Sequence, residues 1–293
     1  MDLSLILEAA LLGVLTGSVY ALMASGLTLI FGVMDIINIA QGAFVILGGY
    51  LSYVLATRLH IDLFVGLLVT MPLMFGLGVV IEWIFIRPLK RDRTMLAILV
   101  TYAVAIIIEG VLTLIFSADL VKLDAWYVTS TFQIGNFYIS YMYLFGFLLS
   151  VVLLGGLYML LYRTKFGAAL RASMQNRTAA QLIGIDVERV SAFTFGIGVA
   201  LTAAGGMAYG ATIPFDAGSH YDLISRLLVI IVLAGMGSLG GALFASVAML
   251  VIVDVTAVVW SPVWSTTVFY ILLVVVLVVR PQGLFGQLAG RKQ

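Results

Sequence analysis

The sequence predicts an all-α membrane protein that crosses the bilayer about eight to ten times, with Gly-rich breaks in some helices. Its 293 residues are 63% hydrophobic and only 10% charged, and the mean hydropathy is +1.18. A water-soluble domain of this size could not bury so much apolar surface. Apolar runs of about 18 or more residues recur, and each can cross a hydrocarbon core of about 30 Å as a helix.

Polar and Gly-rich or Pro-rich breaks separate the predicted spans, which together form one transmembrane domain over residues 1–293. The first apolar run is expected to stay as a span: Asp2 and Glu8 replace the basic n-region of a signal peptide, and the run is too long for one. The nine expected spans cover residues 5–32, 36–57, 62–86, 94–117, 142–162, 191–212, 223–237, 239–258 and 266–280.

The basic residues predict which side of the membrane each connection faces. They gather in alternate connections, which are expected on the cytoplasmic side. With nine spans, the C-terminus is then inside and the N-terminus outside. The three basic clusters are Arg87 with Lys90, Arg91 and Arg93; the connection 163–190; and Arg280 with Arg291 and Lys292.

The connection 163–190 is the most polar stretch of the chain and holds five of its fifteen basic residues. Asn176 can cap a helix start, and Gly184 can take the left-handed turn that ends one, so a cytoplasmic helix is expected over 176–184. Ala179, Leu182 and Ile183 fall at i, i+3 and i+4 and form an apolar stripe. Such a stripe suits a groove in a soluble partner; alternatively, it lies on the lipid headgroups.

Two Gly-rich breaks are candidate linings of a translocation path, because freed backbone groups at membrane depth must be buried in protein or face a water-filled cavity. The plainer alternative is close helix packing or a cytoplasmic turn, and for the second break this alternative is slightly favoured. The candidates are Asn38, Gln41 and Gly42 in the first break, and Ser238, Gly240 and Gly241 in the second.

The same two breaks also suggest an internal repeat. The apolar segments 32–51 and 235–251 share a plan, and each is followed by a span that ends in Arg-Pro, at Arg87 and at Arg280. We interpret residues 1–93 and 223–286 as a weak parallel repeat, with chance similarity as the alternative.

Carboxylates inside apolar spans are costly and therefore need a partner or water. Glu109 and Asp254 are expected to be the deepest, and Glu109 joins the path candidates. Proton transfer is one hypothesis for them; a hydrogen bond between helices is the simpler one, because no buried Lys or His partner is expected. His60 and His220 are both placed in outward-facing loops.

No motif for chemistry is present. The chain has no cysteine, which excludes disulfides and thiolate metal sites. It also has no phosphate-binding Gly-x4-Gly-Lys loop and no metal-binding histidine motif, so we expect no metal site, no bound cofactor and no catalytic residue. A net charge of +1 gives no indication of nucleic acid binding. Gly13-x-x-x-Gly17 and Gly206-x-x-x-Gly210 predict close helix packing.

Five segments resemble, in order and spacing, the permease family of branched-chain amino acid ABC importers. They are GLTLIFGVMDIINIAQGAF (26–44), IRPLKR (86–91), GAALRASMQNRTAAQLIGI (167–185), VLAGMGSLGGAL (232–243) and RPQGLFG (280–286). Ala179-Ala180-x-x-x-Gly184 also looks like the core of the EAA coupling loop of such importers, although Thr178 stands where the motif has Glu.

The resemblance implies a non-catalytic permease subunit of a bacterial or archaeal cell membrane. Its implied partners are two cytoplasmic ATPase subunits that hold ATP and Mg, a second and different permease of the LivM kind, an extracytoplasmic substrate-binding protein and membrane lipid. The implied ATPase-coupling residues are Arg171, Asn176, Thr178, Ala179, Ala180, Leu182, Ile183 and Gly184.

The resemblance indicates the family more clearly than it indicates which solute is imported. Relatives within it import urea and short-chain amides, so these remain alternatives to branched-chain amino acids. A self-sufficient carrier driven by ion gradients through Glu109 or Asp254 is an alternative of another class.

Overall fold

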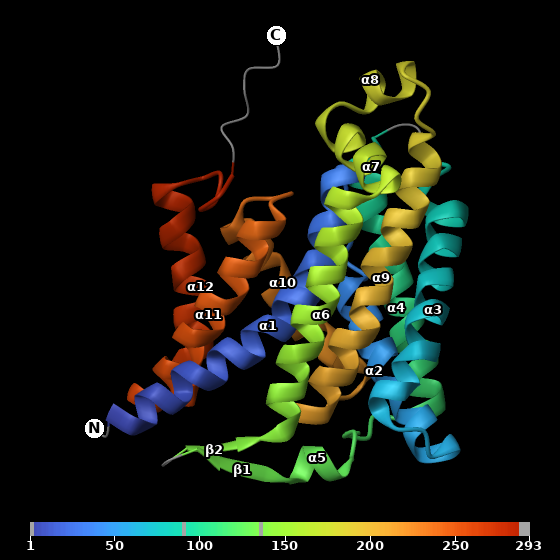
Figure 1. Cartoon of the computed structure of the whole chain (residues 1–293). Helices are drawn as coiled ribbons and strands as arrows, with labels where there is room; N and C mark the ends of the chain where they lie inside the picture. The colour runs from blue at the N-terminus through green and yellow to red at the C-terminus, as the bar shows by residue number, and fades with distance from the viewer. Residues whose placement is uncertain (1–2, 90–91, 135–136, 287–293) are drawn as a thin grey trace.

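The computed structural model describes residues 3–89, 92–134 and 137–286. Within these ranges, nine helical segments are long and apolar enough to cross a membrane, which confirms the predicted number (Figure 1). Asp2 and the basic residues Lys90, Arg91, Arg291 and Lys292, which entered the predictions above, lie outside the described ranges.

The spans agree with the predicted ranges to within a few residues at most ends. The clearest difference is at 36–57, where the first five residues form a non-helical connection. The spans are α1 (Leu3–Met34), α2 (Gln41–Leu59), α3 (Leu63–Ile81) with the π-helical turn η1 (Glu82–Ile86), α4 (Arg93–Phe116), α6 (Tyr141–Arg163), α9 (Val187–Thr212), the short η2 (Ala217–Ser219) with α10 (His220–Ala234), α11 (Leu239–Val259) and α12 (Pro262–Val279).

Several helices begin at a side chain that accepts a hydrogen bond from a free backbone amide, as helix starts require. Ser140 caps α6 in this way, Asp186 caps α9, and Ser261 caps α12, where Pro262 follows in the first turn. The chemistry of each connection therefore determines where the next span starts.

The bundle has two different ends, which Figure 1 shows at the top and the bottom. One end carries α7 (Lys165–Gln175) and α8 (Arg177–Leu182); the basic residues Arg87, Arg163 and Arg280 stand at span ends that lie there. We call it the α8 end, and its cytoplasmic orientation stays a prediction. The other end, called the hairpin end, carries α5 (Trp126–Thr129) and the antiparallel strands β1 (Thr131–Ile134) and β2 (Phe137–Ser140).

The hairpin end is held together by contacts between its connections. Val121 and Phe215 exchange backbone hydrogen bonds of 2.8 and 2.9 Å. The Tyr127 hydroxyl donates to Asp62 at 2.9 Å; burial, and then this hydrogen bond, raise the pKa of Tyr127 above its ordinary value. The elements α5, β1 and β2 lie between the predicted spans 94–117 and 142–162 and were not predicted.

The core forms where glycines let helices meet. A Cβ on Gly13 would lie 2.5 Å from Val251 Cα, and one on Gly17 would lie 2.7 Å from Val247 Cα, so α1 and α11 are in backbone contact. On α9, a Cβ on Gly206 would overlap the Val45 carbonyl oxygen of α2. These contacts confirm the predicted close packing at both glycine motifs.

Candidate functional site

The connection between α1 and α2 enters the bundle rather than running across its end. The backbone amide of Ile39 donates to Thr101 Oγ1 of α4 at 3.2 Å. The Gln41 side chain reaches the carbonyls of Met23 (3.3 Å) and Gly198 (3.5 Å), each about three turns from the α8 end of its helix. The first Gly-rich break is therefore at membrane depth, where buried protein partners satisfy part of its backbone.

Asn38 and Gln41 form a polar pair inside this connection. Both side chains are fully buried, and Asn38 Nδ2 donates to Gln41 Oε1 at 3.0 Å. Asn38 Oδ1 has no hydrogen-bond partner among the described residues. A Cβ on the adjacent Gly42 would lie 2.5 Å from the His220 carbonyl oxygen, so α10 packs directly against α2 here. The role of this pair in a path stays a prediction.

Gln41→Leu is expected to lower the stability of the protein by about 1–3 kcal/mol, because it leaves the buried Asn38 amide without its acceptor. The measurement is the apparent melting temperature of the purified protein in detergent. Gln175→Leu at the exposed end of α7 is the control. Equal melting temperatures for both variants would contradict a structural role for the buried pair.

The second Gly-rich break is a turn at the α8 end, between α10 and α11. Gly235 and Gly237 have φ of +89° and +87°, Ser238 caps α11 by accepting from the Gly241 amide at 3.1 Å, and Gly240 is exposed. The segment after α12 closes over this turn, since the Leu284 amide donates to the Leu233 carbonyl at 2.7 Å. This geometry matches the alternative of a turn.

A cleft of about 1000 Å³ at the α8 end brings together parts that are distant in sequence. Its walls include the end of α1 around Asp35, the α7–α8 connection at Asn176, and the α10–α11 turn at Ser238. The second break and the predicted coupling segment therefore share one surface.

The coupling segment is shorter than predicted, because α8 ends at Leu182 rather than at 184. Its caps are as predicted: Asn176 Oδ1 accepts from the Ala179 amide at 3.0 Å, and Gly184 has φ +86°. Leu182 and Ile183 are 84% and 75% exposed.

The other predicted coupling residues divide between two faces. Thr178 and Ala179 are exposed, whereas Ala180 is buried against the bundle. Arg171, on α7, stacks its guanidinium over the Tyr162 ring of α6 at 4.9 Å from the ring centre. The apolar stripe of Ala179, Leu182 and Ile183 therefore stands free of the bundle.

A charged cluster that sequence reasoning missed joins α8 to the spans. Arg87 pairs with Glu188 of α9, and a cavity of about 260 Å³ is lined by these two residues together with Glu82, Arg93 and Arg177. Arg177 is the first residue of α8. No local signal could reveal the cluster, because its members come from four separate parts of the chain.

The structure corrects the predictions for Glu109 and His220. His220 is not in a loop: it begins α10 and is 2% exposed. Its Nε2 lies 3.9 Å from Glu109 Oε2, which also accepts from the Tyr221 hydroxyl at 2.9 Å. Glu109 therefore has a buried His neighbour, contrary to the prediction, and it lies between the middle of α4 and its hairpin end. It takes the simpler predicted role, a hydrogen bond between helices.

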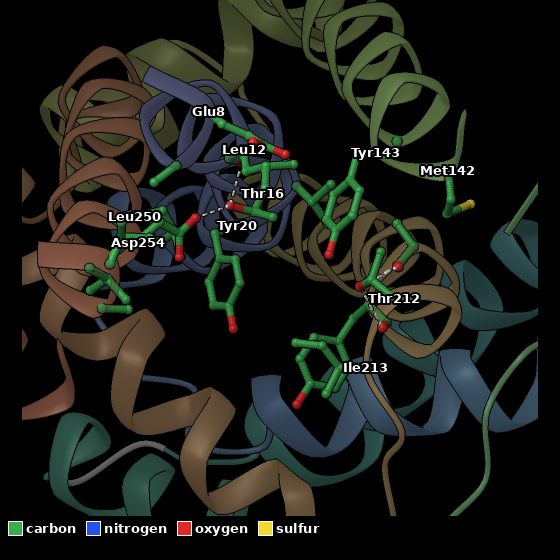
Figure 2. A pocket seen from close by; sticks show the side chains of 18 of the residues that line it. Glu8, Leu12, Thr16, Tyr20, Met142, Tyr143, Thr212, Ile213, Leu250 and Asp254 are labelled. Atoms are coloured by element: carbon green, nitrogen blue, oxygen red, sulfur yellow. Dashed lines mark hydrogen bonds between the residues drawn. The ribbon is translucent and has the colours of Figure 1, made fainter. Parts of the chain in front are cut away.

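A third cavity, called the outer cavity, lies between α1, α6, α9, α10 and α11 on the hairpin side of the bundle. Its volume is about 540 Å³. Figure 2 shows the side chains of Thr16, Tyr20, Tyr143 and Asp254 around it. Thr16 Oγ1 donates to Asp254 Oδ2 at 3.4 Å, so the predicted intramembrane carboxylate has a partner and faces a cavity.

Arg226 of α10 also lines the outer cavity. Its Nε donates to Asp222 Oδ2 at 2.8 Å, one turn earlier on the same helix. Arg226 was not predicted to be functional, and the only signal for it in the sequence was its place in the middle of an apolar run. Five helices contribute to the cavity, so its existence could not be read from any one of them.

Comparisons with known proteins agree with this architecture. A family model described as the permease component of branched-chain amino acid transport systems matches residues 9–277. The chain is 28% identical to the high-affinity branched-chain amino acid transport system permease proteins BraD of Pseudomonas aeruginosa and LivH of Salmonella typhimurium, over 94% of each chain. It is 32% identical to the probable branched-chain amino acid transport permease protein LivH of Methanocaldococcus jannaschii, over 69% of this chain and 64% of that one. No solved structure matches significantly.

Proposed function

Because the chain belongs to the family of permease components of branched-chain amino acid transport systems, we propose that it is the LivH-type subunit of an ABC importer that brings branched-chain amino acids into a bacterial or archaeal cell. The names of the relatives support this cargo over the urea and short-chain amides of the alternative. The subunit carries out no chemistry; separate ATPase subunits hold ATP and Mg and supply the energy.

The observation that carries the proposal is the free apolar surface of α8. Leu182 and Ile183 are largely exposed on a short capped helix that stands apart from the spans. Two exposed apolar side chains on a helix within a polar connection are suited to bind in a groove of a soluble partner. We assign that partner as the ATPase, one copy for each of two permease subunits, the second permease being LivM-like.

A movement of α8 would be transmitted to the spans in two ways, through the chain and through side-chain contacts. The chain passes from α8 directly into α9, and Arg177 shares the charged cavity with Glu82 at the end of α3. A displacement of α8 by ATP-driven closure would therefore change the packing of α9 and α3, and so switch access between the two sides. Such a switch requires two packings of similar free energy that the ATPase contacts differently.

The hairpin end is the surface on which an extracytoplasmic binding protein would deliver cargo. Trp126 and Tyr138 are exposed there at 67% and 62%, and aromatic side chains are enriched at protein interfaces. This assignment requires the N-terminus outside and the C-terminus in the cytoplasm, as the distribution of basic residues predicts.

The test is reconstitution of the chain in liposomes with its ATPases, the second permease and the binding protein. ATP-dependent uptake of leucine, isoleucine and valine is expected, and excess urea should not compete. Uptake by the purified chain alone, driven by an ion gradient, would overturn the proposal in favour of a self-sufficient carrier that uses Glu109 or Asp254.

A further inference from the structure

We propose that the outer cavity is a binding site for a zwitterionic amino acid in transit, in which Arg226 contacts the carboxylate of the amino acid and Asp254 contacts its ammonium group. The assignment rests on the proposed function, because it names the site at which the imported solute is held. Neither residue belongs to the predicted path candidates.

The first argument is that both charged groups have unused binding capacity toward the cavity. The hydrogen bond to Asp222 occupies only Nε of Arg226, and within the described residues its two Nη atoms make no hydrogen bond. Asp254 accepts from Thr16 through Oδ2, and its Oδ1 accepts no hydrogen bond from the part of the chain that the structure describes. A guanidinium is suited to bind a carboxylate through two parallel hydrogen bonds, and a carboxylate is suited to bind an ammonium group.

The second argument is the depth of Arg226 in the bundle. Arg226 lies near the middle of α10, and Tyr20, which also lines the cavity, lies near the middle of α1. Charges at such a depth are costly in hydrocarbon and typically mark solute pathways. A neutral solute such as urea would need neither charge, whereas a zwitterion can pair with both.

The third argument is the rest of the wall. Its polar lining residues are Arg226, Asp254, Glu8, Thr16 and Thr212. The remaining wall consists of tyrosine rings and of aliphatic side chains, among them Leu12, Val19, Leu250 and Val253. A volume of about 540 Å³ falls in the usual range for small-molecule sites, which are mostly apolar with a few placed polar groups. This combination suits a branched aliphatic side chain attached to a charged head.

The fourth argument is that the cavity ends inside the bundle. Along α1, its lining runs from Leu5, at the hairpin end, as far as Tyr20. Beyond it, α1 and α9 are in contact, since a Cβ on Gly26 would lie 2.5 Å from the Gly198 carbonyl oxygen. A solute entering from the hairpin side would therefore stop at the level of Arg226, as a binding site in a transporter requires.

The absence of cysteine from the chain allows a direct test by single-cysteine labelling of the purified protein. Ala257→Cys places a thiol on the cavity wall, and Thr256→Cys, one residue earlier and outside the lining, is the matched control. We expect L-leucine to slow labelling of Ala257→Cys by a water-soluble thiol reagent several-fold and to leave Thr256→Cys unchanged.

Leucine analogues then test the two charge contacts without further mutation. Leucinamide lacks the carboxylate and 4-methylpentanoate lacks the ammonium group, so neither should protect at the concentration at which leucine does. Equal protection by either analogue, or no protection by leucine, would overturn the assignment. Protection by added phosphatidylethanolamine as strong as that by leucine would also overturn it, because a lipid headgroup would then be the ligand.

Arg226→Gln and Asp254→Asn in the Ala257→Cys background should each remove the protection by leucine. In the complete transporter, Arg226→Gln should abolish leucine uptake while the ATPases still associate. If Arg226→Gln imports leucine normally, the site is wrong and the proposed function stands. If the unmodified transporter imports no branched-chain amino acid, the proposed function itself fails.

Discussion

Leu182→Glu is expected to abolish ATP-driven transport while the membrane spans still insert. Leu182 is 84% exposed on α8, so the folded permease loses little from the change. In the proposed complex, however, the new carboxylate would enter an apolar groove without a partner. Apolar anchors at interface centres typically contribute about 2 kcal/mol or more, which is roughly a 30-fold change in affinity.

The measurement is co-purification of the ATPase subunits with the permease, alongside uptake in proteoliposomes. Gln181→Glu is the matched control, because it adds the same charge to the neighbouring exposed position of the same helix without removing an apolar side chain. Gly184→Pro provides a second route to the same result, since proline cannot adopt the φ of +86° found there. Unchanged association in Leu182→Glu would remove α8 from its coupling role.

Gly206→Ala is expected to destabilise the protein, even though alanine is the better helix former. A Cβ at this position would overlap the Val45 carbonyl oxygen, so α2 and α9 would have to separate. Overpacking of this kind typically costs about 1–3 kcal/mol, and in this case the obstacle is backbone, which cannot change rotamer. We expect a lower apparent melting temperature in detergent and less monodisperse protein.

Gly155→Ala is the control with the opposite expected sign. Gly155 lies inside α6, and no atom comes within 4 Å of a Cβ added there. The substitution should therefore stabilise the helix by up to about 1 kcal/mol. If both variants shift the melting temperature in the same direction, helix contact at Gly206 is not what limits substitution.

The spans and the α8 caps were predictable from sequence, because hydropathy, Asn176 and Gly184 act locally. The hairpin also had a local signal, since Gly135-Asn136 separates two short runs rich in aromatic and β-branched residues, a pattern typical of a two-residue hairpin turn. The missed features depend on contacts between distant segments. His220 meets Glu109 only because η2, which leads into α10, packs against α4. Arg226 shares a cavity with Asp254 only because five helices surround that cavity.

α1 is longer than the hydrocarbon core of a bilayer is thick. A helix of 32 residues is about 48 Å long at about 1.5 Å per residue, well beyond a hydrocarbon core of about 30 Å. The surplus is accommodated by inclination, which Figure 1 shows as the diagonal course of α1 relative to α6 and α9. Since α1 also forms one wall of the outer cavity, we expect the inclination of α1, and with it the width of the cavity, to vary with the chain length of the surrounding lipid.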